Sequence, residues 1–178
     1  RWQWFMYLNG FGVKRNIDKG LESLQLATDA GDIDALHHLG SLYISGVYGF
    51  TDTDLGIKLL KQALEAGRGN AAYDLASFYS RRPGEGEKAS HYLAISAAMG
   101  VAEAQYSLGI AYLNWEASNM DRDDAKVLEW LGKAAKQGHK NAQTTLGMLY
   151  LSGSTGTKDK VTGCAWLYLA GDEGLTQE

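Results

Sequence analysis

The chain has 178 residues, of which 45% are hydrophobic and 21% are charged, a composition typical of a globular protein. Its net charge of −4 at pH 7, and the lack of any Lys/Arg run longer than Arg81-Arg82, argue against a general affinity for nucleic acid. The longest apolar stretch, 92–102, has only about half of the roughly 20 residues that a membrane span needs.

Five similar segments follow one another along the chain, and each contains a tyrosine at the same place. These tyrosines are spaced by 36, 36, 33 and 38 residues, at Tyr7, Tyr43, Tyr79, Tyr112 and Tyr150. An alanine precedes each of the last four tyrosines by eight residues, and a glycine precedes that alanine by four. Repeats with a period of about 20 to 50 residues are typical of solenoids and related arrays. Only the link after the tyrosine changes in length, which indicates one variable loop per unit.

Each unit is predicted to form two helices joined by a tight turn. In the second unit, Ala35, Leu39 and Tyr43 recur at helical spacing. The second helix of each unit is expected to stop at a glycine, which adopts the left-handed conformation without strain. These stops fall at Gly31, Gly67, Gly100, Gly138 and Gly174. We expect one repeat array over 1–178, with units of approximately 1–31 (partial), 32–67, 68–100, 101–138 and 139–174, and with 175–178 starting a further unit.

A helix pair of this size cannot bury its apolar face alone, so the pairs are expected to stack. The recurring alanines and glycines let helix axes approach, while leucine, tyrosine and tryptophan fill the remaining space. The predicted fold is all-α, a right-handed α/α superhelix (solenoid) of antiparallel helix-pair repeats. Neither end has a polar capping helix, and we therefore expect the chain to be part of a longer array.

The repeated pattern resembles a known family. It reads A-x-x-x-L-G-x-x-Y-x-x-G, then a loop with an aspartate, then A-x-x-W-x-x-x-A-A-x-x-G, and this is similar to the Sel-one-like repeat (SLR), a relative of the tetratricopeptide repeat. The clearest copy spans 104–138, and 142–174 matches nearly as well. The segment 35–67 matches moderately and 71–100 more weakly. The resemblance implies a helical scaffold that binds proteins, of a kind found in bacteria.

Two units depart from the SLR pattern in the loop after the tyrosine. The glycine expected three residues later is replaced by Arg82 in the third unit and by Trp115 in the fourth. We expect both loops to differ in shape from the others. Arg81, Arg82 and Trp115 are therefore candidates for recognition by a loop.

The sequence contains no recognisable catalytic or metal-binding set. His37 and His38 are adjacent on a predicted helix and point about 100° apart, so they cannot bind one metal ion from one face. Asp34 and His38 lack a third ligand at helical spacing. The aspartates of 121–124 are explained better by helix N-capping than by a calcium loop. We expect no catalytic residue, no metal and no cofactor.

The single cysteine, Cys164, excludes an intrachain disulfide. It lies beside Ala165 and Trp166, and we expect it to be buried as a small apolar residue. The chain begins at Arg1 without a methionine, so a targeting segment could have been removed. A periplasmic or secreted location is favoured slightly over a cytoplasmic one.

The remaining candidates lie on one line of each first helix. If Ala35, Leu39 and Tyr43 are packed, positions 37, 41 and 44 form the neighbouring line, which faces the concave groove in related solenoids. Across the units this line comprises His37, Ser41, Ile44, Tyr73, Ser77, Ser80, Tyr106, Ile110, Leu113, Thr144, Met148 and Leu151, with Phe5 and Leu8 in the first unit. Exposed aromatic and aliphatic groups suit a protein or peptide groove. The alternative is that several of them only pack against adjacent helices.

The favoured function is a non-catalytic scaffold or adaptor that binds a protein or peptide on its concave face, in a bacterial protein. The alternative in the same class is a specific inhibitor (immunity protein) of a secreted toxin or effector. A cell-wall or β-lactam hydrolase is less favoured, because the members proposed to have that activity carry disulfide-linked helix pairs. A structural spacer is also considered. The partner and the oligomeric state are left open.

Overall fold

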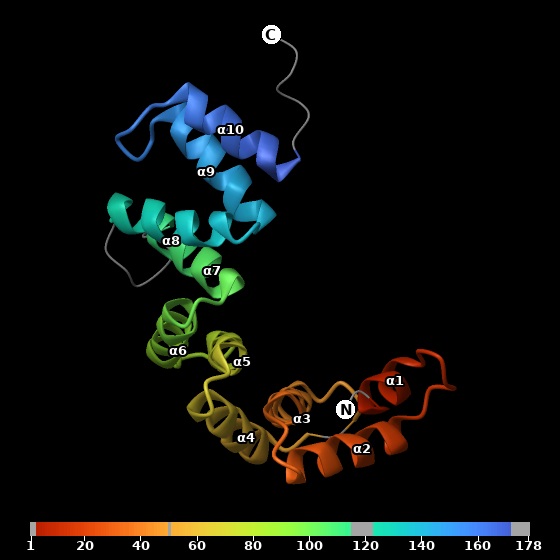
Figure 1. Cartoon of the computed structure of the whole chain (residues 1–178). Helices are drawn as coiled ribbons and strands as arrows, with labels where there is room; N and C mark the ends of the chain where they lie inside the picture. The colour runs from red at the N-terminus through yellow and green to blue at the C-terminus, as the bar shows by residue number, and fades with distance from the viewer. Residues whose placement is uncertain (1–2, 50, 115–122, 172–178) are drawn as a thin grey trace. The chain divides into compact units, whose positions relative to one another are not determined.

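The computed structural model describes residues 3–49, 51–114 and 123–171 (Figure 1). Over these ranges it contains ten α-helices and no strand, so the all-α prediction is confirmed. The helices are α1 (Gln3–Asn9), α2 (Ile17–Asp29), α3 (Ile33–Ser45), α4 (Thr53–Glu65), α5 (Gly69–Ser80), α6 (Gly86–Ala98), α7 (Ala102–Leu113), α8 (Asp124–Lys136), α9 (Lys140–Ser152) and α10 (Lys160–Ala170). None of these helices has the length and apolar character that crossing a membrane demands.

The chain forms two compact units, 1–92 and 93–178, each of which contains several of the repeats described above, and the boundary falls within α6. From here on, the first unit and the second unit are these two compact parts. In the first unit, α1 packs on α2, α2 on α3, α3 on α4 and α4 on α5, while α3 also contacts α5. In the second unit, α7 packs on α8, α8 on α9 and α9 on α10. Each of these helices thus packs mainly on its neighbours along the chain, as expected for stacked helix pairs.

An asparagine or aspartate starts the second helix of four pairs. Its side-chain oxygen accepts a backbone N–H of the first turn, which satisfies one of the free donors at the helix start. These capping residues are Asn16, Asp52, Asp123 and Asp159. The N-cap interpretation is confirmed for Asp123, whereas Asp121 lies outside the described residues.

The ends of the first helices differ, as the sequence predicts. Gly46 after α3 and Gly153 after α9 adopt left-handed φ angles of 65° and 74°. In contrast, α5 ends at Arg81 with φ −87°, because no glycine is available there. Trp115, which corresponds to Arg82 in the repeat pattern, lies outside the described residues.

Glycines with positive φ follow the second helices at the predicted places Gly31, Gly67, Gly100 and Gly138. The last helix is different. Its C-cap is Gly171, with φ 79°, three residues before the glycine that the repeat spacing selected. Gly174 itself is outside the described residues.

Small residues let the two helices of a pair approach closely. A Cβ added at Gly147 of α9 would lie 2.5 Å from the Cγ of Leu167 and 3.0 Å from the carbonyl oxygen of Gly163, both in α10. The same reciprocal glycine contact joins Gly40 of α3 to Gly56 of α4. These glycines inside the helices are therefore required by helix contact, whereas the glycines that follow the helices are required by backbone conformation.

The leucines of the repeat pattern fill the contacts between helices. Leu39, Leu108 and Leu146 are exposed by only 3%, 3% and 2%, as the packing argument requires. The prediction for Cys164 is wrong, since this residue is exposed. On α10, Gly163 and Leu167 are the buried residues, and Cys164 is turned by one residue, about 100°, away from Gly163.

Two buried glutamines of the second compact unit, 93–178, make the same hydrogen bond in successive repeats. The Nε2 atom of Gln105 donates to the carbonyl of Ala97 at 3.1 Å, and that of Gln143 donates to the carbonyl of Ala135 at 3.0 Å. In both cases a first helix binds the end of the helix that precedes it. The shared dipeptide Ala-Gln is the sequence signal for this contact, although its role is visible only in the structure.

Candidate binding groove

The first compact unit has an open groove of about 720 Å³. Its walls come mainly from α1, α3 and α5, the first helices of their repeats. We call it the α1–α3–α5 groove. Its lining residues are Trp4, Phe5, Leu8, Asn9, His38, Ser41, Leu42, Ile44, Ser45, Tyr48, Thr51, Thr53, Asp74, Ser77, Phe78, Arg81 and Arg82.

A carboxylate lies between α3 and α5 in this groove. Asp74 of α5 accepts the Nε2–H of His37 at 2.9 Å and the hydroxyl of Ser41, both from α3, on the same oxygen Oδ2. Because a carboxylate only accepts, the Nε2 atom of His37 carries the proton. The side chain of His37 is 9% exposed and that of Asp74 is 30% exposed, so the carboxylate joins a buried group to the groove surface.

Burial raises the pKa of the Asp74 carboxyl group, but the hydrogen bonds from His37 and Ser41 and the charges of His37 and His38 lower it by more. The resulting pKa lies below its ordinary value. Asp74 is therefore ionised at neutral pH. It is a permanent negative charge at the groove surface.

A serine, a histidine and an aspartate are close together here, but their geometry does not suit nucleophilic catalysis. In a catalytic triad the serine hydroxyl donates to the histidine, which removes its proton. Here the hydroxyl of Ser41 donates to Asp74 instead, and the Nδ1 atom of His37 is buried without a hydrogen-bond partner among the described residues. The three residues form a structural contact between α3 and α5.

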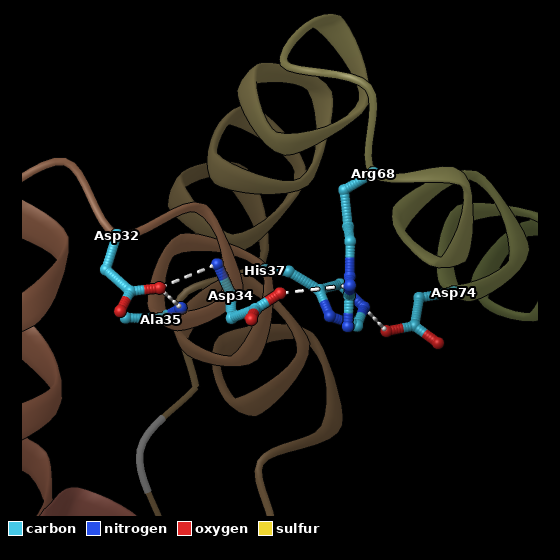
Figure 2. A network of polar contacts seen from close by, with 6 residues as sticks. All are labelled: Asp32, Asp34, Ala35, His37, Arg68 and Asp74. Carbon is cyan, nitrogen blue, oxygen red and sulfur yellow. Dashed lines mark hydrogen bonds and ion pairs between the residues drawn. The ribbon is translucent and has the colours of Figure 1, made fainter. Parts of the chain in front are cut away.

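A second polar contact holds the turn before α5 against α3. Figure 2 shows Arg68 extending to Asp34, with Nη1 and Oδ1 3.0 Å apart. Asp32 caps the same helix by accepting the backbone N–H groups of Asp34 and Ala35. Asp34 is thus engaged by an arginine, and no three His, Cys, Asp or Glu side chains of the described ranges are placed to hold a metal ion.

His38 lies at the groove surface with its ring 4.7 Å from that of Trp4, measured between centroids. Burial lowers the pKa of His38 below its ordinary value of 6.5, and the charges of His37 and Arg68 lower it further. Asp34 and Asp74 oppose this shift more weakly. His38 is therefore neutral in the folded chain at neutral pH.

This shift predicts a pH-dependent loss of stability. As the pH falls through about 6.5, the unfolded chain takes up a proton on His38 before the folded chain does, so the free energy of unfolding decreases. The variant His38→Gln should lose less stability than the wild type between about pH 7 and the lower folded-state pKa. Urea unfolding at several pH values measures the difference, and parallel curves for both chains would contradict it.

Two arginines, Arg81 and Arg82, follow the end of α5, and we call them the arginine pair. The Nη2 atom of Arg81 donates to the hydroxyl of Ser77 at 3.2 Å. The guanidinium carbon of Arg82 lies 3.6 Å from the ring centroid of Phe78. Both arginines are exposed, and neither forms an ion pair within the described ranges.

The structure brings many of the nominated residues of the first unit into one groove. Those that line it are Phe5, Leu8, Ser41, Ile44, Ser77, Arg81 and Arg82. His37 is buried and binds Asp74, so for this residue the packing alternative holds. Tyr73 is half-buried and Ser80 is exposed, and neither lines the groove.

In the second compact unit, 93–178, most of the nominated residues pack against neighbouring side chains. Tyr106 stacks on His139 with 4.6 Å between ring centroids, and Ile110 and Leu113 lie against the core of that unit. Thr144 and Leu151 are half-buried, whereas Met148 is 57% exposed. Trp115 lies outside the described residues.

Two groove residues that matter for its chemistry were not nominated from the sequence. Asp74 and Phe78 occupy α5, in the unit whose resemblance to the repeat pattern is weakest. The available signal was an aspartate three residues after Ala71, where the other units have His38, Ser107 and Thr145. Its partners are more than 30 residues away, so sequence spacing alone could not identify the contact.

Comparison with known proteins supports the repeat assignment. The Sel1 repeat model matches residues 5–32, 33–67, 102–139 and 140–175. A Sel1 repeat protein from Oxalobacter formigenes has 29% sequence identity and a TM-score of 0.81, and the match covers 95% of this chain and 70% of that one. A protective antigen of uropathogenic Escherichia coli that displays an SLR fold has 28% identity and a TM-score of 0.74, covering 97% of this chain and 37% of that one.

A more distant structure is an immunity protein from Pseudomonas aeruginosa. It has 21% identity and a TM-score of 0.66, and the match covers 95% of this chain and 65% of that one, so the likeness concerns the fold. A comparison with curated proteins found no match. The four segments that match the repeat model make up more than half of the sequence, and the predicted SLR resemblance is confirmed. This chain belongs to the Sel1 repeat family, and its fold is an all-α solenoid.

Proposed function

We propose that this chain is a non-catalytic scaffold that binds a segment of a protein partner in the α1–α3–α5 groove. Sel1 repeats suggest a role in protein interaction, which supports the class. The observation that carries the proposal is the groove itself, which combines aromatic rings with arginines. The few residues that carry most of the binding energy at protein interfaces are enriched in tryptophan, tyrosine and arginine.

The absence of catalysis is also part of the proposal. It is supported by the arrangement of Ser41, His37 and Asp74, in which the serine is bonded to the carboxylate and not to the histidine. A non-catalytic groove needs only contact area and complementary polar groups. The nominated residues of the second unit, including the exposed Met148, stay predictions for a further contact surface.

A second candidate is inhibition of a secreted toxin. Three Pseudomonas aeruginosa proteins share the fold at 20% to 22% identity, and two of them are described as immunity proteins. That likeness supports the fold on which such a role would depend. Co-expression with the product of a neighbouring gene tests this candidate, and rescue of growth from a toxic product would favour it over the adaptor role.

Two groove substitutions and one control test the leading proposal. Phe5 is 40% exposed in the groove, while Leu55 is 37% exposed on α4, outside it. The variant Phe5→Ser/Ser77→Trp removes a contact and fills part of the groove, and we expect it to weaken partner binding by about tenfold or more. Leu55→Ser should bind as the wild type does.

The measurement is affinity purification with quantitative mass spectrometry, followed by titration of each captured protein. Circular dichroism confirms that both variants are folded. Partners that bind the groove variant as tightly as they bind Leu55→Ser would contradict the α1–α3–α5 groove as the binding surface. Turnover of a peptidoglycan or β-lactam substrate would contradict the non-catalytic part.

A further inference from the structure

We propose, as a refinement that rests on the proposed function, that the groove recognises a peptide segment with an acidic side chain next to an apolar one. The carboxylate of a glutamate or aspartate binds the arginine pair. The neighbouring aromatic or aliphatic side chain lies in the apolar part of the groove formed by α1 and α3. The argument depends on the orientation of the arginines, on the charge of the groove and on its apolar walls.

The arginine pair is held in place before any partner binds. Arg81 is anchored by its hydrogen bond to Ser77, and Arg82 by stacking on Phe78. Each contact uses only part of the guanidinium group, which has five N–H donors in a planar arrangement. The remaining donors suit a carboxylate, because its two oxygens match the guanidinium geometry in pairs.

No carboxylate of the described ranges forms an ion pair with these arginines. The acidic residue nearest to them in sequence, Glu85, is bound by Lys88, with Nζ and Oε2 2.7 Å apart. The acid that lines the groove is Asp74, which is engaged by His37 and Ser41. An acidic partner residue would thus supply a missing counter-charge and would not have to displace an existing one.

The position of Asp74 limits where an acidic residue can bind. Among the described lining residues it is the one carboxylate, and it belongs to α5 like Ser77 and Phe78. A second negative charge beside it would be repelled, whereas the arginine pair attracts one. A doubly charged phosphate would also cost more to desolvate near Asp74 than a single carboxylate. The groove therefore favours a carboxylate at the arginine end and uncharged groups elsewhere.

The apolar part of the groove provides the second contact. Its side chains are contributed by α1 and α3 and include Trp4, Phe5, Leu8, Leu42 and Ile44. Phe5 is 40% exposed and stacks on Phe11 with 5.7 Å between ring centroids. An aromatic or aliphatic side chain that covers Phe5 gains from removing this surface from water.

Selection from a random-peptide library against the intact chain tests the inference. We expect enriched peptides to contain glutamate or aspartate beside an aromatic or aliphatic residue. Affinities of synthetic copies are then measured by fluorescence anisotropy. The variant Arg81→Glu/Arg82→Glu should bind them about tenfold to a hundredfold more weakly. The control Lys58→Glu/Lys61→Glu makes the same change in charge on two exposed residues of α4 and should leave the affinity unchanged.

Charge exchange separates direct contact from a structural effect. A peptide whose acidic residue is replaced by lysine should bind Arg81→Glu/Arg82→Glu more tightly than it binds the wild type. The neutral variant Arg81→Gln/Arg82→Gln serves if the charge reversal impairs folding, which circular dichroism detects. Wild-type affinity should also fall as salt is added, because the contact is charged and exposed.

Three outcomes would overturn the inference. Enriched peptides could lack acidic residues, could bind the charge-reversed chain unchanged, or could bind more tightly with phosphoserine in place of glutamate. If such peptides still lost affinity for Phe5→Ser/Ser77→Trp, the groove would remain the binding surface and only the carboxylate would be excluded. If the library yielded no peptide that binds the wild type above background, the proposed function would be contradicted as well.

Discussion

Replacing Leu131 with alanine is expected to lower the free energy of unfolding by about 2–5 kcal/mol. Leu131 of α8 is fully buried and belongs to the core formed with Val127 and Leu146. The loss has two parts, the hydrophobic contact of the removed atoms and the cavity that they leave. Urea unfolding followed by far-UV circular dichroism measures the change.

The helix that faces Leu131 offers an internal test. A Cβ at Gly109 of α7 would lie 2.8 Å from the Cγ of Leu131. Gly109→Ala should therefore destabilise the wild type, but it should be tolerated better, or even stabilise, when Leu131→Ala has removed the opposing atoms. Leu169→Ala is the matched control, because Leu169 is 60% exposed and its loss should change stability by at most about 0.5 kcal/mol. Additive effects of the two substitutions would contradict the proposed contact.

The second large effect is that replacing two different glycines with alanine is expected to change the free energy of unfolding in opposite directions. Gly147→Ala is expected to lower the free energy of unfolding by about 1–3 kcal/mol, because the added methyl group overlaps Leu167 and approaches the backbone of Gly163. Gly132, inside α8, has no atom within 4 Å of its added Cβ. Gly132→Ala should therefore stabilise the chain, by up to about 1 kcal/mol, since alanine favours the helix.

The free energies of unfolding of both glycine variants and of the wild type are measured by the same urea unfolding. A stabilising Gly147→Ala would show that α9 and α10 separate at little cost. A destabilising Gly132→Ala would contradict the open space that the structure shows around this glycine. The opposite signs are the specific prediction.

These stability effects bear on function through the helices that carry the groove. The contact of Gly40 with Gly56 holds α3 against α4, and Asp74 joins α3 to α5. A groove built on packed helices positions its side chains more exactly than one built on loops. The groove substitutions proposed above avoid these packed positions, so a loss of binding can be separated from a loss of folding.

Much of this molecule follows from local patterns in the sequence. Helical spacing of Ala35, Leu39 and Tyr43 is sufficient to predict α3, because one face of a helix must be apolar to pack. The recurring glycines predict the helix pairs, and the aspartates before the second helices predict their starts. These features depend on neighbours within a few residues, and the repeat shows each of them several times.

The groove chemistry was decided by tertiary structure. His37, nominated as a surface residue, is buried, and its Nε2–H is bound by Asp74 of the next repeat. Cys164, expected to be buried, is exposed because Gly163 and Leu167 take the contact with α9. Asp74 was not nominated, because its hydrogen-bond partners, His37 and Ser41, belong to α3 and are distant in the sequence. A repeat pattern identifies the residues that pack within each unit. The contact of Asp74 with the preceding repeat is made by a residue that differs from the pattern, and such a contact can be identified only when the helices are placed in space.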